Sequence, residues 1–141
     1  MSPSAPLNVL VVEDREEDAE TLRTVLRQDG HRVRVAADGE AALRAALDEP
    51  PDVMLLDLAL PKLDGYQVAA AARNVVWRRR PLLVAVTGHG EDEYRRRAAA
   101  AGIDLFMVKP VDPDVLRSAL RTYKSVVVND PRRTARWAGE P

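Results

Sequence analysis

The chain has 141 residues, of which 46% are hydrophobic, so it is long enough for one domain with a single core and too apolar to be disordered. Its formal net charge of -1 argues against a protein whose main activity is nucleic-acid binding. The absence of cysteine excludes disulfides, a thiol nucleophile and a zinc site built on thiolates.

The first residues do not resemble a secretion signal. The segment Met1 to Pro6 contains no basic residue, and the apolar stretch after it is only a few residues long. No apolar run in the sequence approaches the roughly 20 residues that a membrane-spanning helix needs. We therefore expect a soluble, cytoplasmic protein that does not contact a membrane.

Short apolar runs alternate with longer amphipathic stretches, which is the pattern of βα units around a parallel sheet. The predicted strands are residues 7–12, 32–36, 52–56, 82–86 and 104–108. The predicted helices are residues 16–29, the stretch between Asp38-Gly39 and Pro50-Pro51, residues 65–77, residues 91–101, and a last helix from Asp112-Pro113 that includes Tyr123. The third and fourth strands lack apolar–polar alternation, as expected of strands covered by helices on both faces.

Single residues mark the ends and the buried sides of these helices. Gly30 is placed to end the first helix, and Asp112 reads as an N-cap before Pro113. The residues expected to face the core are Ala19, Leu22, Val25 and Leu26 in the first helix, Ala42, Leu43, Ala46 and Leu47 in the second, and Val115, Leu116, Ala119, Leu120 and Tyr123 in the last.

The chain is too short for a closed eight-unit barrel, which needs about 250 residues, so we predict an open, doubly wound α/β sheet. We divide it into an N-terminal extension (residues 1–6), one domain (residues 7–125) and a tail or linker (residues 126–141). The stretch 128–141 contains three arginines, two prolines and Trp137 without apolar periodicity.

Polar side chains directly follow four of the predicted strands. Glu13 and Asp14 follow the first strand, Asp57 the third, Thr87 the fourth and Lys109 the fifth. Parallel strands end at the same edge of their sheet, which is where ligands bind in open α/β sheets. We therefore expect these five side chains to form one site.

Three neighbouring carboxylates repel one another, since two like charges 4 Å apart repel by about 4 kcal/mol at an effective dielectric constant of 20. Lys109 offsets only part of this charge, so a bound cation or raised carboxyl pKa values are expected. Mg²⁺ suits such an oxygen site. Together with Lys109 and the Thr87 hydroxyl, it would stabilise a phosphoryl group approaching a carboxylate nucleophile.

In order and spacing these residues resemble the receiver domains of two-component response regulators. The resemblance covers about residues 7–123. It depends on Glu13-Asp14, Asp57 with Pro61 and Asp64-Gly65, Thr87-Gly88, and Lys109-Pro110. It implies a flavodoxin-like (βα)5 fold whose five parallel strands have the order 2-1-3-4-5.

The resemblance also implies the roles of the acidic residues. Asp57 would be the phosphoacceptor, taking a phosphoryl group from a histidine of a sensor kinase or of a histidine phosphotransfer protein. Asp14 and Asp57 would bind Mg²⁺ directly. Glu13 would act through a water, and the backbone carbonyl of Ala59 would be a further ligand.

The remaining implied roles concern the response to phosphorylation. Lys109 would pair with the aspartate and then with the phosphoryl group, Thr87 would move toward that group, and Phe106 would turn inward as the switch aromatic. The surface made by residues 91–101, 104–108 and the last helix would then change and regulate a downstream protein that the sequence does not identify. Phe106 has no hydroxyl, so packing alone would select its rotamer. By the same resemblance, Ala59 and His89 occupy variable positions that in the family tune how fast the phosphoryl group is lost.

Other proteins with related chemistry fit less well. A flavin phosphate would be repelled by the loop Glu13-Asp14-Arg15-Glu16, and no glycine-rich dinucleotide turn follows the first strand. A haloacid-dehalogenase-type phosphatase usually has a second aspartate two residues after the first, where this chain has Ala59. We therefore expect self-catalysed phosphorylation with slow hydrolysis, and no multiple-turnover enzyme.

Several charged residues are expected to be ordinary surface groups. The acidic run that includes Glu16, Glu17 and Asp18 is interpreted as a solvated first helical turn. The triplets at 78–80 and 95–97 are all arginine, and we expect no direct nucleic-acid contact from them; a protein partner is favoured for 95–97. His31 is expected to be structural or exposed. Two alternatives to the switch stay open: a phosphorylation-independent interaction domain, or the receiver part of a hybrid kinase or larger regulator.

Overall fold

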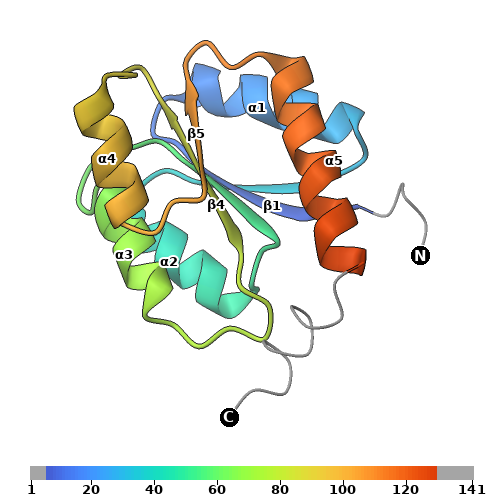
Figure 1. Ribbon diagram of the computed structural model, residues 1–141, viewed down its shortest axis with the longest axis horizontal. Coiled ribbons are helices and arrows are strands. Elements are labelled where there is room, and N and C mark those ends of the chain that lie inside the picture. The colour runs from blue at the N-terminus through green and yellow to red at the C-terminus, as the bar shows by residue number, and fades with distance from the viewer. Residues whose placement is uncertain (1–5, 130–141) are drawn as a thin grey trace.

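The computed structural model describes residues 6–129. Its centre is one sheet of five parallel strands (Figure 1). The strands are β1 (Asn8–Val12), β2 (Arg32–Ala36), β3 (Val53–Leu56), β4 (Leu82–Thr87) and β5 (Leu105–Val108). Their order across the sheet is β2-β1-β3-β4-β5, as predicted.

Five helices cover the two faces of this sheet. They are α1 (Glu16–Gln28), α2 (Gly39–Asp48), α3 (Gly65–Arg73), α4 (Asp92–Ala100) and α5 (Pro113–Asn129). Helices α1 and α5 lie on one face and α2, α3 and α4 on the other (Figure 1). Within residues 6–129 no helix is both long and apolar enough to cross a membrane. The division expected between residues 125 and 126 falls inside α5 and stays a prediction, and Trp137 lies outside the described residues.

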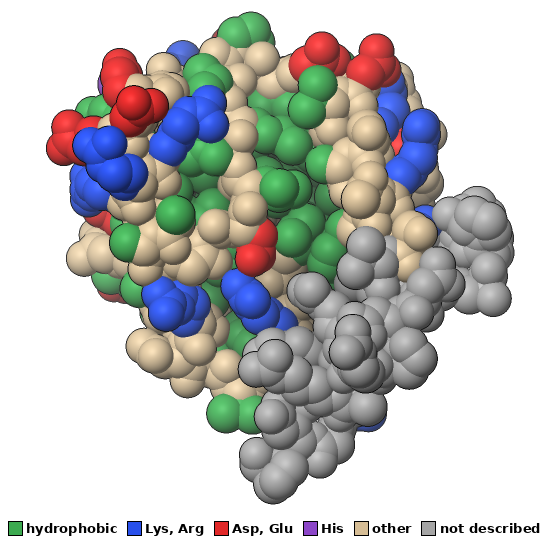
Figure 2. Space-filling view, in the orientation of Figure 1, with side chains coloured by type: hydrophobic (Ala, Val, Ile, Leu, Met, Phe, Trp, Pro, Cys, Tyr) green, Lys and Arg blue, Asp and Glu red, His purple; other side chains and the backbone are tan. Residues whose placement is uncertain are grey.

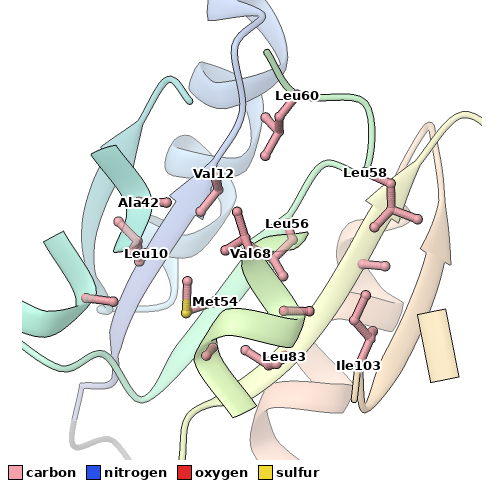
Figure 3. Close-up of a cluster of buried hydrophobic side chains, with 14 of the residues drawn as sticks. Leu10, Val12, Ala42, Met54, Leu56, Leu58, Leu60, Val68, Leu83 and Ile103 are labelled. Atoms are coloured by element: carbon pink, nitrogen blue, oxygen red, sulfur yellow. The ribbon is translucent and has the colours of Figure 1, made fainter. Parts of the chain in front are cut away.

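Each face of the sheet carries its own hydrophobic cluster. Figure 3 shows Leu10, Met54 and Leu83 of the sheet beside Ala42 of α2 and Val68 of α3. The cluster on the opposite face includes Leu22 and Leu26 of α1 with Leu116, Leu120 and Tyr123 of α5. All residues of β3 and β4 are buried, which explains why their sequences do not alternate.

The helix ends follow local rules that the sequence predicts. Gly30 follows α1 with φ +85°, a conformation that side chains with a Cβ rarely adopt. The Asp38 carboxylate accepts a 2.8 Å hydrogen bond from the backbone N–H of Ala41 and so caps α2. The Asp112 carboxylate accepts one of the same length from the N–H of Asp114, which confirms the predicted start of α5.

The predicted helix over residues 65–77 is wrong in its last four residues, 74–77. Helix α3 ends at Arg73, and Asn74 is its C-cap. Trp77 turns back beneath the helix, where its buried indole Nε1 donates a 2.9 Å hydrogen bond to the carbonyl of Ala72. This tertiary contact satisfies a carbonyl at the helix end and buries the largest apolar side chain of the segment.

Two residues expected in the core are exposed. Leu47, in the last turn of α2, is 56% exposed, and Val115, in the first turn of α5, is 53% exposed. The buried side of α5 is centred on Leu116 and Leu120, and Val115 is one residue, or about 100°, away from it. The apolar residues of each helix form a stripe along its surface, and the sheet covers only part of that stripe.

Candidate functional site

The ends of β1 and β3 bring three carboxylates together. Glu13 and Asp57 are buried, with 3% and 7% of their surface exposed, whereas Asp14 is exposed. One carboxylate oxygen from each lies within 4.8 Å of the others. The backbone N–H of Asp57 donates to the carbonyl of Val12 at 2.9 Å, so the pairing of β1 with β3 sets where Asp57 stands.

Lys109 comes from the end of β5 and contacts these acidic groups directly. Its Nζ lies 2.5 Å from Glu13 Oε1, 2.9 Å from Asp18 Oδ2 and 3.3 Å from Asp57 Oδ2. The backbone N–H of Lys109 donates to the Thr87 carbonyl at 2.7 Å, which places β5 beside β4 at this edge. The prediction that Glu13 and Asp14 lie close to Asp57 and Lys109 is therefore confirmed.

Asp18 is a site residue that the sequence analysis missed. It was expected to be part of a solvated acidic turn, which is wrong for this residue, since its carboxylate pairs with Lys109. This hydrogen bond holds the pKa of Asp18 below its ordinary value. The available signal was its place in the first turn of the helix that directly follows Glu13 and Asp14, close to the edge where the strands end.

Burial and crowding shift two pKa values at this site. Burial first, and then the neighbouring Asp57 carboxylate, raise the pKa of Glu13 from 4.5 to about 7, while Lys109 opposes the shift. Burial lowers the pKa of Lys109, but hydrogen bonds to Glu13 and Asp18 and the charge of Asp57 outweigh it and hold that pKa above its ordinary value. The ammonium group is therefore charged at neutral pH.

The loop after β3 is built closely around Asp57. Its Oδ1 accepts a 2.9 Å hydrogen bond from the backbone N–H of Ala59. A Cβ added at Gly65 would lie 2.5 Å from the Asp57 carbonyl oxygen and 2.7 Å from Leu58 Cα, so only glycine fits there. Asp64 caps α3 by a capping box, which holds Gly65 at the first helical position. The Asp64-Gly65 pair thus shapes the loop that carries Asp57.

Thr87 ends β4 at the same edge and is 1% exposed. Its Oγ1 accepts a 3.3 Å hydrogen bond from the backbone N–H of His89. The His89 ring stacks on Tyr94 of α4, with 4.8 Å between the ring centroids. The loop that follows Thr87 is therefore connected to α4.

Phe106, the predicted switch aromatic, is half-buried on the edge strand β5. Its ring packs against the cluster on the α4 side of the sheet and is covered by the Arg95 guanidinium, whose carbon is 4.7 Å from the ring centroid. The Arg97 guanidinium lies 4.1 Å from the centroid of Tyr66 in the same way. Two of the three arginines at 95–97 thus cover aromatic rings of their own chain.

The other arginine triplet is also engaged within the domain. Arg79 pairs with Asp52 at 3.3 Å and Arg80 with Asp104 at 3.0 Å. His31 is buried, and its Nδ1 accepts a 3.1 Å hydrogen bond from the backbone N–H of Leu7, so the expected structural role is confirmed.

The acidic cluster has the donors that Mg²⁺ prefers. Its carboxylate oxygens are hard ligands, and Asp14 leaves one side of the cluster open to solvent. A single ammonium, Lys109, stands against Glu13, Asp18 and Asp57. The carboxylates therefore outnumber the ammonium, and the excess negative charge suits a bound divalent cation.

Known proteins have sequences similar to this chain. The transcriptional regulatory protein KdpE of Mycobacterium tuberculosis is 35% identical over 80% of this chain and 49% of its own length. An uncharacterized 14.6 kDa protein of Leptolyngbya boryana is 29% identical over 87% of this chain and 94% of its own. This chain therefore spans nearly all of one relative and about half of the other.

Solved structures agree in fold. The receiver domain of the sensor histidine kinase PA1611 from Pseudomonas aeruginosa, which has a magnesium ion coordinated in its active site cleft, is 30% identical, with a TM-score of 0.79 over 86% of this chain and 99% of that one. The chemotaxis response regulator CheY4 of Vibrio cholerae is 26% identical, with a TM-score of 0.78 over 84% of this chain and 99% of its own. The family model described as response regulator receiver domain matches residues 9–121. This chain belongs to the response regulator receiver domain family.

Proposed function

We propose that the domain is a phosphorylation-dependent switch of a two-component phosphorelay, with Asp57 as the phosphoacceptor. The observation that carries this proposal is the position of Lys109, whose Nζ is 3.3 Å from Asp57 Oδ2 within a cluster of carboxylates. A buried, crowded carboxylate beside a charged ammonium is arranged for nucleophilic attack on an anionic phosphoryl group.

The phosphoryl donor would be a phosphohistidine of a sensor histidine kinase or a histidine phosphotransfer protein. A bond forms between an Asp57 carboxylate oxygen and phosphorus, the P–N bond of the donor breaks, and the leaving imidazole takes up a proton. Lys109 and the Thr87 hydroxyl would hold the phosphoryl oxygens. The likeness to the PA1611 receiver, which belongs to a sensor histidine kinase, supports this choice of donor. Receiver domains usually act in the cytoplasm, so we propose that the reaction takes place there.

Asp14 and Asp57 would hold Mg²⁺ directly, Glu13 through a water, and the Ala59 carbonyl would be a further ligand. The oxygen-rich donor set supports this assignment, as does the magnesium ion in the similar PA1611 receiver. When bound, the ion would offset the charge of the carboxylates and of the incoming phosphoryl group.

The output would be a change in the surface formed by α4, β5 and α5. Among the residues of α4, all of which the structure describes, only Ala98 is buried, so little apolar contact opposes a shift of this helix. A movement of Thr87 and Phe106 would shift α4, because the loop after Thr87 and the Phe106 ring both contact this helix. Figure 2 shows hydrophobic side chains in the hollow between α4 and α5, where Leu105 and Val108 of the edge strand β5 are 38% and 37% exposed. We propose that a downstream protein binds there.

Intact-mass spectrometry after incubation with acetyl phosphate tests the proposal. The wild-type protein should gain one phosphoryl adduct that requires Mg²⁺, and Asp57→Asn should gain none. Asp48→Asn, which changes an exposed aspartate at the end of α2, is the matched control and should label like wild type.

An adduct that persists in Asp57→Asn would overturn the choice of acceptor. A folded wild-type protein that binds Mg²⁺ and gains no adduct would favour the phosphorylation-independent interaction domain.

A further inference from the structure

Asp18 contacts the lysine of the site without belonging to the acidic cluster formed by Glu13, Asp14 and Asp57. Lys109 Nζ is closer to Asp18 Oδ2, at 2.9 Å, than to Asp57 Oδ2, at 3.3 Å. In the unphosphorylated domain the ammonium is therefore shared among Glu13, the acceptor Asp57 and a carboxylate on the first turn of α1.

The helix fixes the position of Asp18. The backbone N–H of the next residue, Ala19, donates to the Arg15 carbonyl at 3.0 Å, and Ala19 is buried against the sheet. Arg15 Nε also lies 3.6 Å from the Asp18 carboxylate at the surface. Asp18 is thus held at a constant distance from the sheet edge by regular helical structure.

Lys109 has open space on the α1 side. A cleft of about 360 Å³ lies between α1 and the start of α5 and is lined by both Asp18 and Lys109. Among the residues that line this cleft, Asp18 is the one acidic group. On the α1 side of the cleft, Asp18 is therefore the acidic group that pairs with the ammonium, while Glu13 and Asp57 pair with it at the sheet edge.

We propose that Asp18 is a positioning residue that restrains Lys109 in the unphosphorylated domain and thereby slows phosphorylation of Asp57. This inference rests on the proposed function. During phosphoryl transfer Lys109 must approach the phosphoryl oxygens, so its pairing with Asp18 has to weaken. The Asp18 carboxylate also adds negative charge where an anionic donor arrives.

The labelling rate with acetyl phosphate at saturating Mg²⁺ tests this role. Asp18→Asn should label about fivefold faster than wild type, which is the order expected for releasing one partly exposed ion pair. Asp18→Glu, whose carboxylate still reaches the ammonium, should return the rate toward the wild-type value. A merely structural role predicts the opposite sign, because a disturbed site labels more slowly.

Glu16→Gln is the matched control. It removes the same charge from the first turn of α1, and the Glu16 side chain makes no hydrogen bond or ion pair with any residue in 6–129. Its labelling rate should equal that of wild type. Equal acceleration in Glu16→Gln and Asp18→Asn would show a general charge effect and overturn the positioning role.

A second readout does not depend on phosphorylation. The chain has three lysines, Lys62, Lys109 and Lys124, so the Cε signals of ¹³C-labelled lysine are simple to assign. The Lys109 signal should shift in Asp18→Asn and stay unchanged in Glu16→Gln. An unchanged Lys109 signal, or equal labelling rates in Asp18→Asn and wild type, overturns the role of Asp18. A wild-type protein that never labels overturns the proposed function, and with it the effect on rate.

Discussion

The Arg95 guanidinium lies over the ring of Phe106, 4.7 Å from the ring centroid, while Arg95 Nε donates a 3.1 Å hydrogen bond to the Gly90 carbonyl. One side chain thereby connects α4, the loop before it and β5. Phe106 has no hydroxyl with which to select a rotamer, and the guanidinium supplies a polar contact that favours one position of the ring.

Arg95→Ala should lower the free energy of unfolding by about 0.5–1 kcal/mol, since it removes a partly exposed cation–π contact. Urea unfolding measures the change. Arg96→Ala is the control, because Arg96 is exposed and has no contact of this kind within the described residues. In a Phe106→Leu background the cost of Arg95→Ala should shrink; an undiminished cost would show that the ring and the guanidinium are not coupled.

The raised pKa of Glu13 makes stability depend on pH. A carboxyl whose pKa is 4.5 in the unfolded chain and about 7 in the folded domain favours folding fully below pH 4.5, and this contribution is lost as pH rises through 7. Without Mg²⁺, wild type should therefore lose about 1–3 kcal/mol relative to Glu13→Gln between pH 5 and pH 8.

Denaturant unfolding of wild type and Glu13→Gln from pH 5 to pH 8 measures whether the stability of wild type falls relative to the variant as pH rises. Other titrating groups cancel in the difference between them, which isolates Glu13. A constant difference would mean that Glu13 is ionised throughout the range, with its charge fully compensated by Lys109.

Mg²⁺ should stabilise the folded domain. At a free Mg²⁺ concentration 100 times the dissociation constant, binding raises the free energy of unfolding by about 2.7 kcal/mol. Tm rises accordingly, and a chelator reverses the change. Asp14→Asn removes the exposed carboxylate of the cluster and should abolish most of this gain. Thermal unfolding with and without Mg²⁺ measures it. Asp48→Asn should respond like wild type, and an equal response from Asp14→Asn would place the ion elsewhere.

Gly65→Ala should damage the acceptor loop. Its Cβ would lie 2.5 Å from the Asp57 carbonyl oxygen, so either the loop or the start of α3 must move. We expect a loss of about 1–3 kcal/mol in the free energy of unfolding, together with slower labelling of Asp57. Gly88→Ala is the control, because a Cβ there meets no heavy atom within 4 Å. Equal effects from both substitutions would contradict the steric explanation.

Much of the fold could be predicted from local patterns. Strands β3 and β4 are continuous apolar runs, and the caps at Asp38 and Asp112 depend on backbone groups only a few residues away. The end of α3 could not be predicted, because the segment after Arg73 leaves the helix to bury Trp77 in the core, and that burial depends on the packed sheet. The exposure of Leu47 and Val115 likewise depends on how far the sheet extends beneath each helix.

The sequence by itself determined that Glu13, Asp57 and Lys109 meet, because parallel strands end at one edge of the sheet and each of these residues follows a strand. Only the tertiary structure decided how the charge is shared there. Asp18 and Lys109 are 91 residues apart, and their contact depends on the packing of α1 beside the end of β5. Electrostatic interactions weaken with distance and solvent exposure, so the partner of a charged group is known only when the positions of all its neighbours are known.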